Sequence, residues 1–139
     1  MGVRALQAAR KVVTVLLVED DRLIREYIVT DLRREGWAVL EAATGAGALK
    51  ALHEAENVDL LITDIGLADA LSGWDVAEAF RISHPAVPVI YASGNPANDH
   101  RRVPGSVFLT KPVAASELTA TCRKLLADHV PERGVADAG

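Results

Sequence analysis

Polar residues stand at the ends of four short apolar runs of the sequence, and their types could do chemistry together. In chain order these residues are Glu19, Asp20 and Asp21 after the first run, then Asp64, then Ser93, then Lys111. The carboxyl ends of parallel strands meet at one edge of a sheet, which is where ligands bind in open α/β sheets. If the four runs are such strands, carboxylates, a hydroxyl and an amine gather at a single edge.

The chemistry that this set of groups suggests is phosphoryl chemistry supported by a divalent cation. Neighbouring carboxylates repel each other, which raises the pKa of at least one of them unless a cation lies between them. Mg²⁺ is the natural cation, because it binds one or two carboxylates together with carbonyl oxygens and waters. A lysine and a hydroxyl can hold a phosphoryl group, which a facing carboxylate can attack to form an acyl phosphate. Asp64 is the best candidate for the attacking group, because it ends the central apolar run.

The elements that would position these residues alternate along the chain. Short, continuous, β-branched runs are typical of strands buried on both faces. Such runs cover residues 13–18, 38–42, 58–63, 87–92 and 107–110. Helical patterns separate most of them. The alternation predicts an α/β fold, a doubly wound, five-stranded parallel sheet with helices on both faces.

The predicted helices have recognisable starts, ends and apolar faces. The first carries a face at helical spacing that we expect to pack on the sheet: Ile24, Tyr27, Ile28 and Leu32. Thr44 can cap a second helix that reaches about residue 55. Two more helices are predicted over 73–82 and 116–127. Residues 93–105 are rich in Gly and Pro, so no regular helix is predicted there.

The length of 139 residues fits one domain. We expect that domain to cover residues 12–127, between an N-terminal tail (1–11) and a C-terminal tail (128–139) that lack apolar periodicity.

Composition excludes several classes of protein. A net charge of −4 argues against sequence-independent binding to nucleic acid. The strongest apolar stretch, residues 12–18, is far shorter than the roughly 20 residues of a membrane span. A single cysteine, Cys122, allows no intrachain disulfide. We therefore expect a cytoplasmic domain with no direct nucleic-acid or membrane partner.

Four segments together resemble the receiver domain of two-component response regulators, of the stand-alone type. They read VLLVEDD (15–21), DLLITD (59–64), PVIYASG (88–94) and KP (111–112), in that order, within residues 13–127. The resemblance implies a flavodoxin-like sheet with strand order 2-1-3-4-5. It also implies a signalling phosphoacceptor that catalyses only its own phosphorylation and dephosphorylation.

The resemblance assigns Asp64 as the phosphoacceptor, which takes its phosphoryl group from a phosphohistidine. The donor would be a histidine kinase or a histidine phosphotransfer protein. The implied cofactor is Mg²⁺, held by Glu19, Asp20, Asp64 and the backbone carbonyl of Gly66. An unidentified downstream protein would read the phosphorylated state, and the chain would be a monomer or a weak homodimer.

The resemblance also implies a switch and a peptide-bond geometry. Ser93 and Lys111 would contact the phosphoryl group. Ser93 and Phe108 would form the switch, with the hydroxyl moving toward the phosphoryl group. The Lys111–Pro112 bond is expected to be cis.

The sequence departs from the family pattern in three places. Ala68 stands where receivers usually carry proline, and the loop over 64–73 is one residue longer than the common form. The stretch from 93 to 111 is shorter than usual by about one helical turn. We therefore expect the fourth helix of the family to be degraded or absent.

Several residues also have plain structural interpretations. Asp21 can simply start a helix, while Phe108 and Cys122 can be core residues. Other functions stay open. A degenerate receiver would bind a partner without phosphorylation. An aspartate-based phosphohydrolase would need a second Asp at Gly66, and a flavin carrier would need a Ser/Thr-rich loop after the first strand.

Overall fold

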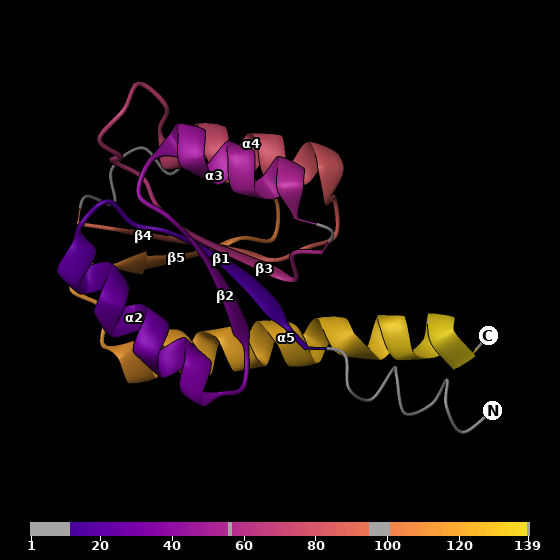
Figure 1. Ribbon diagram of the computed structural model, residues 1–139. Coiled ribbons are helices and arrows are strands. Elements are labelled where there is room, and N and C mark those ends of the chain that lie inside the picture. The colour runs from indigo at the N-terminus through magenta and orange to yellow at the C-terminus, as the bar shows by residue number, and fades with distance from the viewer. Residues whose placement is uncertain (1–11, 56, 95–100, 139) are drawn as a thin grey trace.

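The computed structural model describes residues 12–55, 57–94 and 101–138. A five-stranded parallel sheet lies between two pairs of helices (Figure 1). The elements in chain order are β1 (Thr14–Val18), α2 (Arg22–Arg34), β2 (Ala38–Ala42), α3 (Gly45–Glu54), β3 (Leu60–Asp64), α4 (Gly73–Ser83), β4 (Val89–Ser93), β5 (Val107–Thr110) and α5 (Ala115–Ala138). The predicted α/β class is confirmed. The predicted tail at residues 1–11 lies outside the described residues.

The strands are ordered β2-β1-β3-β4-β5, as the resemblance implied. All neighbouring pairs are parallel, so their carboxyl ends share one edge of the sheet. β1 and β3 are central, and their apolar side chains are almost wholly buried because helices cover both faces. The register pairs Val18 with Thr63 and Asp64 with Ala92, which brings the ends of β1, β3 and β4 together.

Each face of the sheet has its own apolar core. α3 and α4 cover one face, where Leu16, Leu61 and Phe80 are buried. α2 and α5 cover the other, where Leu17, Ile62 and Cys122 are buried (Figure 1). Cys122 is fully buried, which confirms it as a core residue, and burial raises the pKa of its thiol to about 12.

The first helix packs differently from the sequence prediction. Leu32 is buried as expected, together with Val29, but Ile24 and Tyr27 are 38% and 58% exposed. The first turns of α2 lie beside the loop that follows β5, where Ile24, Tyr27 and Ile28 line a shallow groove. Periodicity identified an apolar face correctly but could not show that only its later half is covered by the sheet.

Helix starts follow the capping rules. The side chain of Asp21 accepts hydrogen bonds from the amides of Leu23 and Ile24, so its helix-start role is confirmed. Thr44 caps α3 as predicted, and Ser72 and Asp75 form a capping box at the start of α4.

The connection from β4 to β5 has no α-helix among the residues described there, 94 and 101–106. The expected loss of the family's fourth helix is confirmed within those residues, while residues 95–100 lie outside the described part. The segment is instead held by side chains. The Tyr91 hydroxyl accepts a hydrogen bond from the Val103 amide at 3.1 Å, and Arg101 bonds to Asp75 and Glu78 on α4 at 3.0 and 2.7 Å.

The last helix is longer than the sequence predicts. Apolar spacing predicted a helix over 116–127 and a non-helical tail over 128–139, but α5 runs Ala115–Ala138. Leu118 and Leu126 are buried against the sheet, and the later turns extend past it (Figure 1). The prediction was wrong for 128–138 because turns that leave the sheet need no apolar stripe. Within the described residues, none of the helices has the length and apolar character needed to cross a membrane.

Candidate functional site

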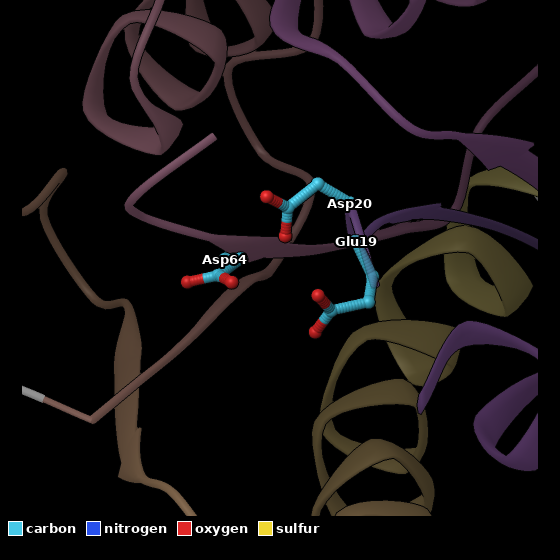
Figure 2. Close-up of side chains that lie close together, drawn as sticks. All are labelled: Glu19, Asp20 and Asp64. Carbon is cyan, nitrogen blue, oxygen red and sulfur yellow. The ribbon is translucent and has the colours of Figure 1, made fainter. Parts of the chain in front are cut away.

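Three carboxylates meet at the carboxyl edge of the sheet. Glu19 and Asp20 follow β1 directly, and Asp64 is the last residue of β3. Each offers an oxygen that lies within 4.8 Å of an oxygen of the other two. Figure 2 shows the three side chains directed toward a common space. The predicted grouping is therefore present.

Lys111 joins two of these carboxylates. Its Nζ lies 2.7 Å from Glu19 Oε1 and 2.9 Å from Asp64 Oδ2. β5 brings it there, and its main-chain amide donates to the carbonyl of Ser93 at 2.8 Å. The Lys111–Pro112 bond is cis, as expected.

Burial shapes the electrostatics of this cluster. The Glu19 side chain is 4% exposed, and burial raises its pKa above the usual value even though the hydrogen bond from Lys111 lowers it. Burial alone would lower the pKa of Lys111, but its hydrogen bonds to Glu19 and Asp64 outweigh that effect and leave the pKa raised. Lys111 therefore stays charged and offsets part of the acidic charge.

The main chain holds the carboxylates of buried Glu19 and half-buried Asp64 in place. Glu19 Oε2 accepts from the Asp21 amide at 3.0 Å, and Asp64 Oδ1 accepts from the Ile65 amide at 2.7 Å. Each oxygen of both carboxylates thus has a partner. Since a carboxylate oxygen has two lone pairs, each can still accept a further ligand.

The other predicted residues are Ser93, Gly66 and Phe108, and they occupy different environments. Ser93 ends β4, is 9% exposed and pairs with Thr110 of β5 in the strand register. Gly66 is exposed, two residues after Asp64. Phe108 is partly buried beside the contacting rings of Trp74 and Tyr91, and its ring centroid lies 6.4 Å from each of theirs. That packing bears out its interpretation as a core aromatic, and its switch role remains a prediction.

Sequence reasoning missed two residues that touch the site. Arg25 donates from Nη1 to the carbonyl oxygen of Glu19 at 2.8 Å. Gly73 donates its amide to the Ile65 carbonyl at 2.8 Å, and its Cα lies against the main chain of Asp64. Both contacts are local in sequence, between residues six and eight positions apart, but they depend on the course of the loop between them. A glycine directly at a helix start was the one available signal of a close backbone approach.

An apolar groove opens beside Lys111. Its volume is ≈ 220 Å³, and its walls come from α2, the end of β4, the Lys111–Val113 loop and α5. Leu23, Ile24 and Tyr27 are three of the five exposed large apolar side chains in the described part of the chain. Such a patch beside a polar site is typical of a contact surface for another protein.

The donor set fits a hard divalent cation. Three carboxylates carry more negative charge than the single Lys111 ammonium offsets, and their oxygens are close enough to share one ion. Oxygen ligands of this type suit Mg²⁺.

Comparisons with known proteins found a matching family model and several relatives. The family model described as "Response regulator receiver domain" matches residues 15–123. The probable transcriptional regulatory protein TcrX of Mycobacterium tuberculosis is 32% identical over 118 residues, covering 82% of this chain and 50% of TcrX. Sensor kinase CckA of Brucella abortus is 32% identical over 118 residues, covering 81% of this chain and 12% of the kinase.

A solved structure is similar over most of its length. The response regulator receiver protein from Sinorhizobium medicae WSM419 has a TM-score of 0.79 and 30% identity, covering 84% of this chain and 96% of that one. The chain spans about half the length of the curated transcriptional regulators it matches, such as TcrX.

Proposed function

The chain belongs to the response regulator receiver domain family, and from this premise we propose that Asp64 accepts a phosphoryl group in two-component signalling. The observation that carries the proposal is the position of the Lys111 ammonium, 2.9 Å from Asp64 and 2.7 Å from Glu19. A cation held against a carboxylate at the carboxyl end of a central strand suits an incoming phosphoryl group.

The reaction follows from the groups around Asp64. The Ile65 amide holds Oδ1 at 2.7 Å and orients the carboxylate, and we assign Oδ2, which Lys111 can release, as the attacking oxygen. A phosphorus–oxygen bond to Oδ2 forms as the phosphorus–nitrogen bond to the donor histidine breaks, and the imidazole departs with the electron pair. The product is an aspartyl phosphate.

Lys111 and Ser93 receive the transferred group. The Lys111 ammonium already contacts Oδ2, so a small shift lets it donate to the phosphoryl oxygens instead. The Ser93 hydroxyl, at the end of the neighbouring strand, supplies a second donor. The Lys111 amide donates a hydrogen bond to the Ser93 carbonyl, so a shift of the main chain at one of these residues displaces the main chain at the other.

Glu19, Asp20, Asp64 and the Gly66 carbonyl are the groups we assign to Mg²⁺. Bound there, the ion supplies positive charge that offsets the repulsion between the carboxylates and the phosphoryl oxygens. The mutual distances of the three carboxylates support this assignment.

The partner that donates the phosphoryl group is a histidine kinase or a histidine phosphotransfer protein. We propose that it docks on the apolar groove beside Lys111. Ile24 and Tyr27 line that groove together with Lys111, which contacts Asp64, and they are 38% and 58% exposed. Docking on that face would bring the donor histidine to the open side of the carboxylate.

Intact-mass measurement tests the proposed function. The protein is incubated with acetyl phosphate or phosphoramidate, with and without Mg²⁺, as wild type, as Asp64→Asn and as the matched control Asp31→Asn on α2. We expect one phosphoryl adduct that requires Mg²⁺, is absent from Asp64→Asn and persists in Asp31→Asn. Small donors need no docking surface, so the result reports on the site alone.

Two outcomes contradict the proposal. An adduct that persists in Asp64→Asn would place the phosphoacceptor elsewhere. Failure of both donors in the wild type, together with failure to bind beryllofluoride, would favour a binding module that works without phosphorylation.

A further inference from the structure

Arg25 connects three segments around the acidic cluster. From α2, its Nη1 donates to the carbonyl oxygen of Glu19 at 2.8 Å, and its Nε lies 3.3 Å from Oε1 of Glu41 on β2. The Arg25 side chain is 17% exposed, so these contacts are largely screened from water. The guanidinium geometry allows it to serve both partners at once.

The Glu19 main chain is held on both sides as a result. Its amide donates to the carbonyl of Ala42 at 3.0 Å, and its carbonyl accepts from Arg25. That carbonyl belongs to the peptide plane between Glu19 and Asp20, so its orientation sets where the Asp20 Cα lies. Figure 2 shows the Asp20 carboxylate directed into the space shared with Asp64.

We propose that Arg25, held by Glu41, is a positioning residue that fixes the Glu19–Asp20 peptide and thereby orders the Mg²⁺ site. The inference rests on the proposed function, since it concerns the ion assigned to Glu19, Asp20 and Asp64. Groups that orient metal ligands without touching the metal commonly change its affinity substantially when removed.

The direction in which Mg²⁺ affinity changes when Arg25 is replaced distinguishes a positioning role from a purely electrostatic one. Arg25 carries a positive charge close to a cation site, so removing that charge alone should strengthen Mg²⁺ binding. Loss of positioning should weaken it. The two explanations therefore predict opposite changes in the dissociation constant for the same variant.

Arg33 provides a matched control. It also pairs with Glu41, with its Nη2 3.6 Å from Oε2, but its side chain is 58% exposed. Arg33 pairs with the carboxylate of Glu41, whereas Arg25 also donates to the main-chain carbonyl of Glu19. Arg33→Ala thus removes a charge from the same ion pair while leaving the Glu19 carbonyl bonded.

The experiment titrates Mg²⁺ alone into wild type, Arg25→Ala, Arg33→Ala and Glu41→Gln by isothermal calorimetry. We expect Arg25→Ala to weaken binding by about tenfold. Arg33→Ala should bind as tightly as the wild type or slightly tighter. Glu41→Gln keeps an acceptor for Arg25 and should weaken binding less than Arg25→Ala. In Mg²⁺-free buffer, the ¹³C shift of the Glu19 carbonyl should change in Arg25→Ala and stay unchanged in Arg33→Ala.

Unchanged or tighter Mg²⁺ binding by Arg25→Ala would overturn the inference while leaving the proposed function intact, provided the wild type binds Mg²⁺ and forms the adduct. A wild type that binds no Mg²⁺ would count against both. If Arg25→Ala does not fold, Arg25→Met, which keeps the apolar stem but lacks the guanidinium, decides the matter, because unchanged or tighter Mg²⁺ binding by that folded variant would contradict the positioning role.

Discussion

The Cα of Gly73 lies so close to the main chain of Asp64 that a Cβ built on it would stand 1.9 Å from the Asp64 carbonyl oxygen. The start of α4 therefore rests directly on the residue that ends β3. The obstructing atoms belong to the backbone, which cannot rotate away as a flexible side chain could. The loop over residues 65–72 is therefore held at both ends, by Asp64 of β3 and by Gly73 of α4.

Gly73→Ala should destabilise the protein and disturb Asp64. We expect a loss of about 3 kcal/mol in the free energy of unfolding, because the added methyl group forces α4 away from β3. Urea denaturation measures the loss. Gly94→Ala is the control, since a Cβ there would meet nothing within 4 Å. Equal stability of the two variants would show that the close approach at Gly73 is easily relaxed.

Lys111→Met should destabilise the protein, because the carboxylates of the site then repel each other with no ammonium group between them. In buffer with EDTA we expect a loss of about 2 kcal/mol, because two charge-assisted hydrogen bonds disappear and Glu19 remains buried. Saturating Mg²⁺ should restore part of that stability by supplying another cation. Urea denaturation in both buffers gives the comparison.

Lys124→Met on the exposed surface of α5 is the matched control for Lys111. Its stability should stay within about 0.5 kcal/mol of the wild type in both buffers. A Lys111→Met variant as stable as the wild type in EDTA would mean that the ammonium is not what holds Glu19 and Asp64 together.

The sheet and its polar edge could be predicted because each depends on local sequence. β-branched apolar runs marked all five strands, and β2 and β5 have the predicted bounds. Since parallel strands share an edge, Asp64 and Lys111 could be expected to meet although they are 47 positions apart, and Lys111 Nζ lies 2.9 Å from Asp64 Oδ2.

Tertiary contacts set the features that the sequence did not reveal. The apolar spacing of Ile24 and Tyr27 is the same whether a helix face is covered or open, so their exposure could not be predicted. The ion pair between Arg25 and Glu41 depends on how α2 lies against β2. The turns of α5 after Leu126 extend past the sheet (Figure 1), so the sequence has no apolar periodicity there that would predict a helix.

Tyr91→Phe should loosen the connection between β4 and β5. The Tyr91 hydroxyl is the acceptor for the buried amide of Val103, at 3.1 Å. Removing it leaves that amide without this partner, at a cost of about 1–3 kcal/mol. We expect lower stability in urea and faster hydrogen exchange at the Val103 amide. Tyr27→Phe, on the exposed surface of α2, should change neither quantity. Unchanged exchange at Val103 in Tyr91→Phe would show that another group holds the segment.

Asp75 links the start of α4 to the segment after β4, and its contribution should depend on pH. The hydrogen bond from the Ser72 amide, followed by that from Arg101, holds the pKa of Asp75 below its usual value. A carboxyl group whose pKa is lowered on folding stabilises the folded state above its unfolded pKa of about 3.9. That stabilisation is lost as the pH falls through the folded pKa.

Asp75→Asn should therefore be less stable than the wild type at pH 7, and the difference should narrow as the pH falls below about 4. Urea denaturation of both proteins across that range isolates the contribution of this one carboxylate, because their other acidic groups are shared. Asp31→Asn, which removes the partner of Arg34 on the surface of α2, should show a small difference at every pH. A gap between Asp75→Asn and the wild type that stayed constant down to pH 3 would mean that the ionised form of Asp75 adds nothing to the capping box or to the Arg101 pair.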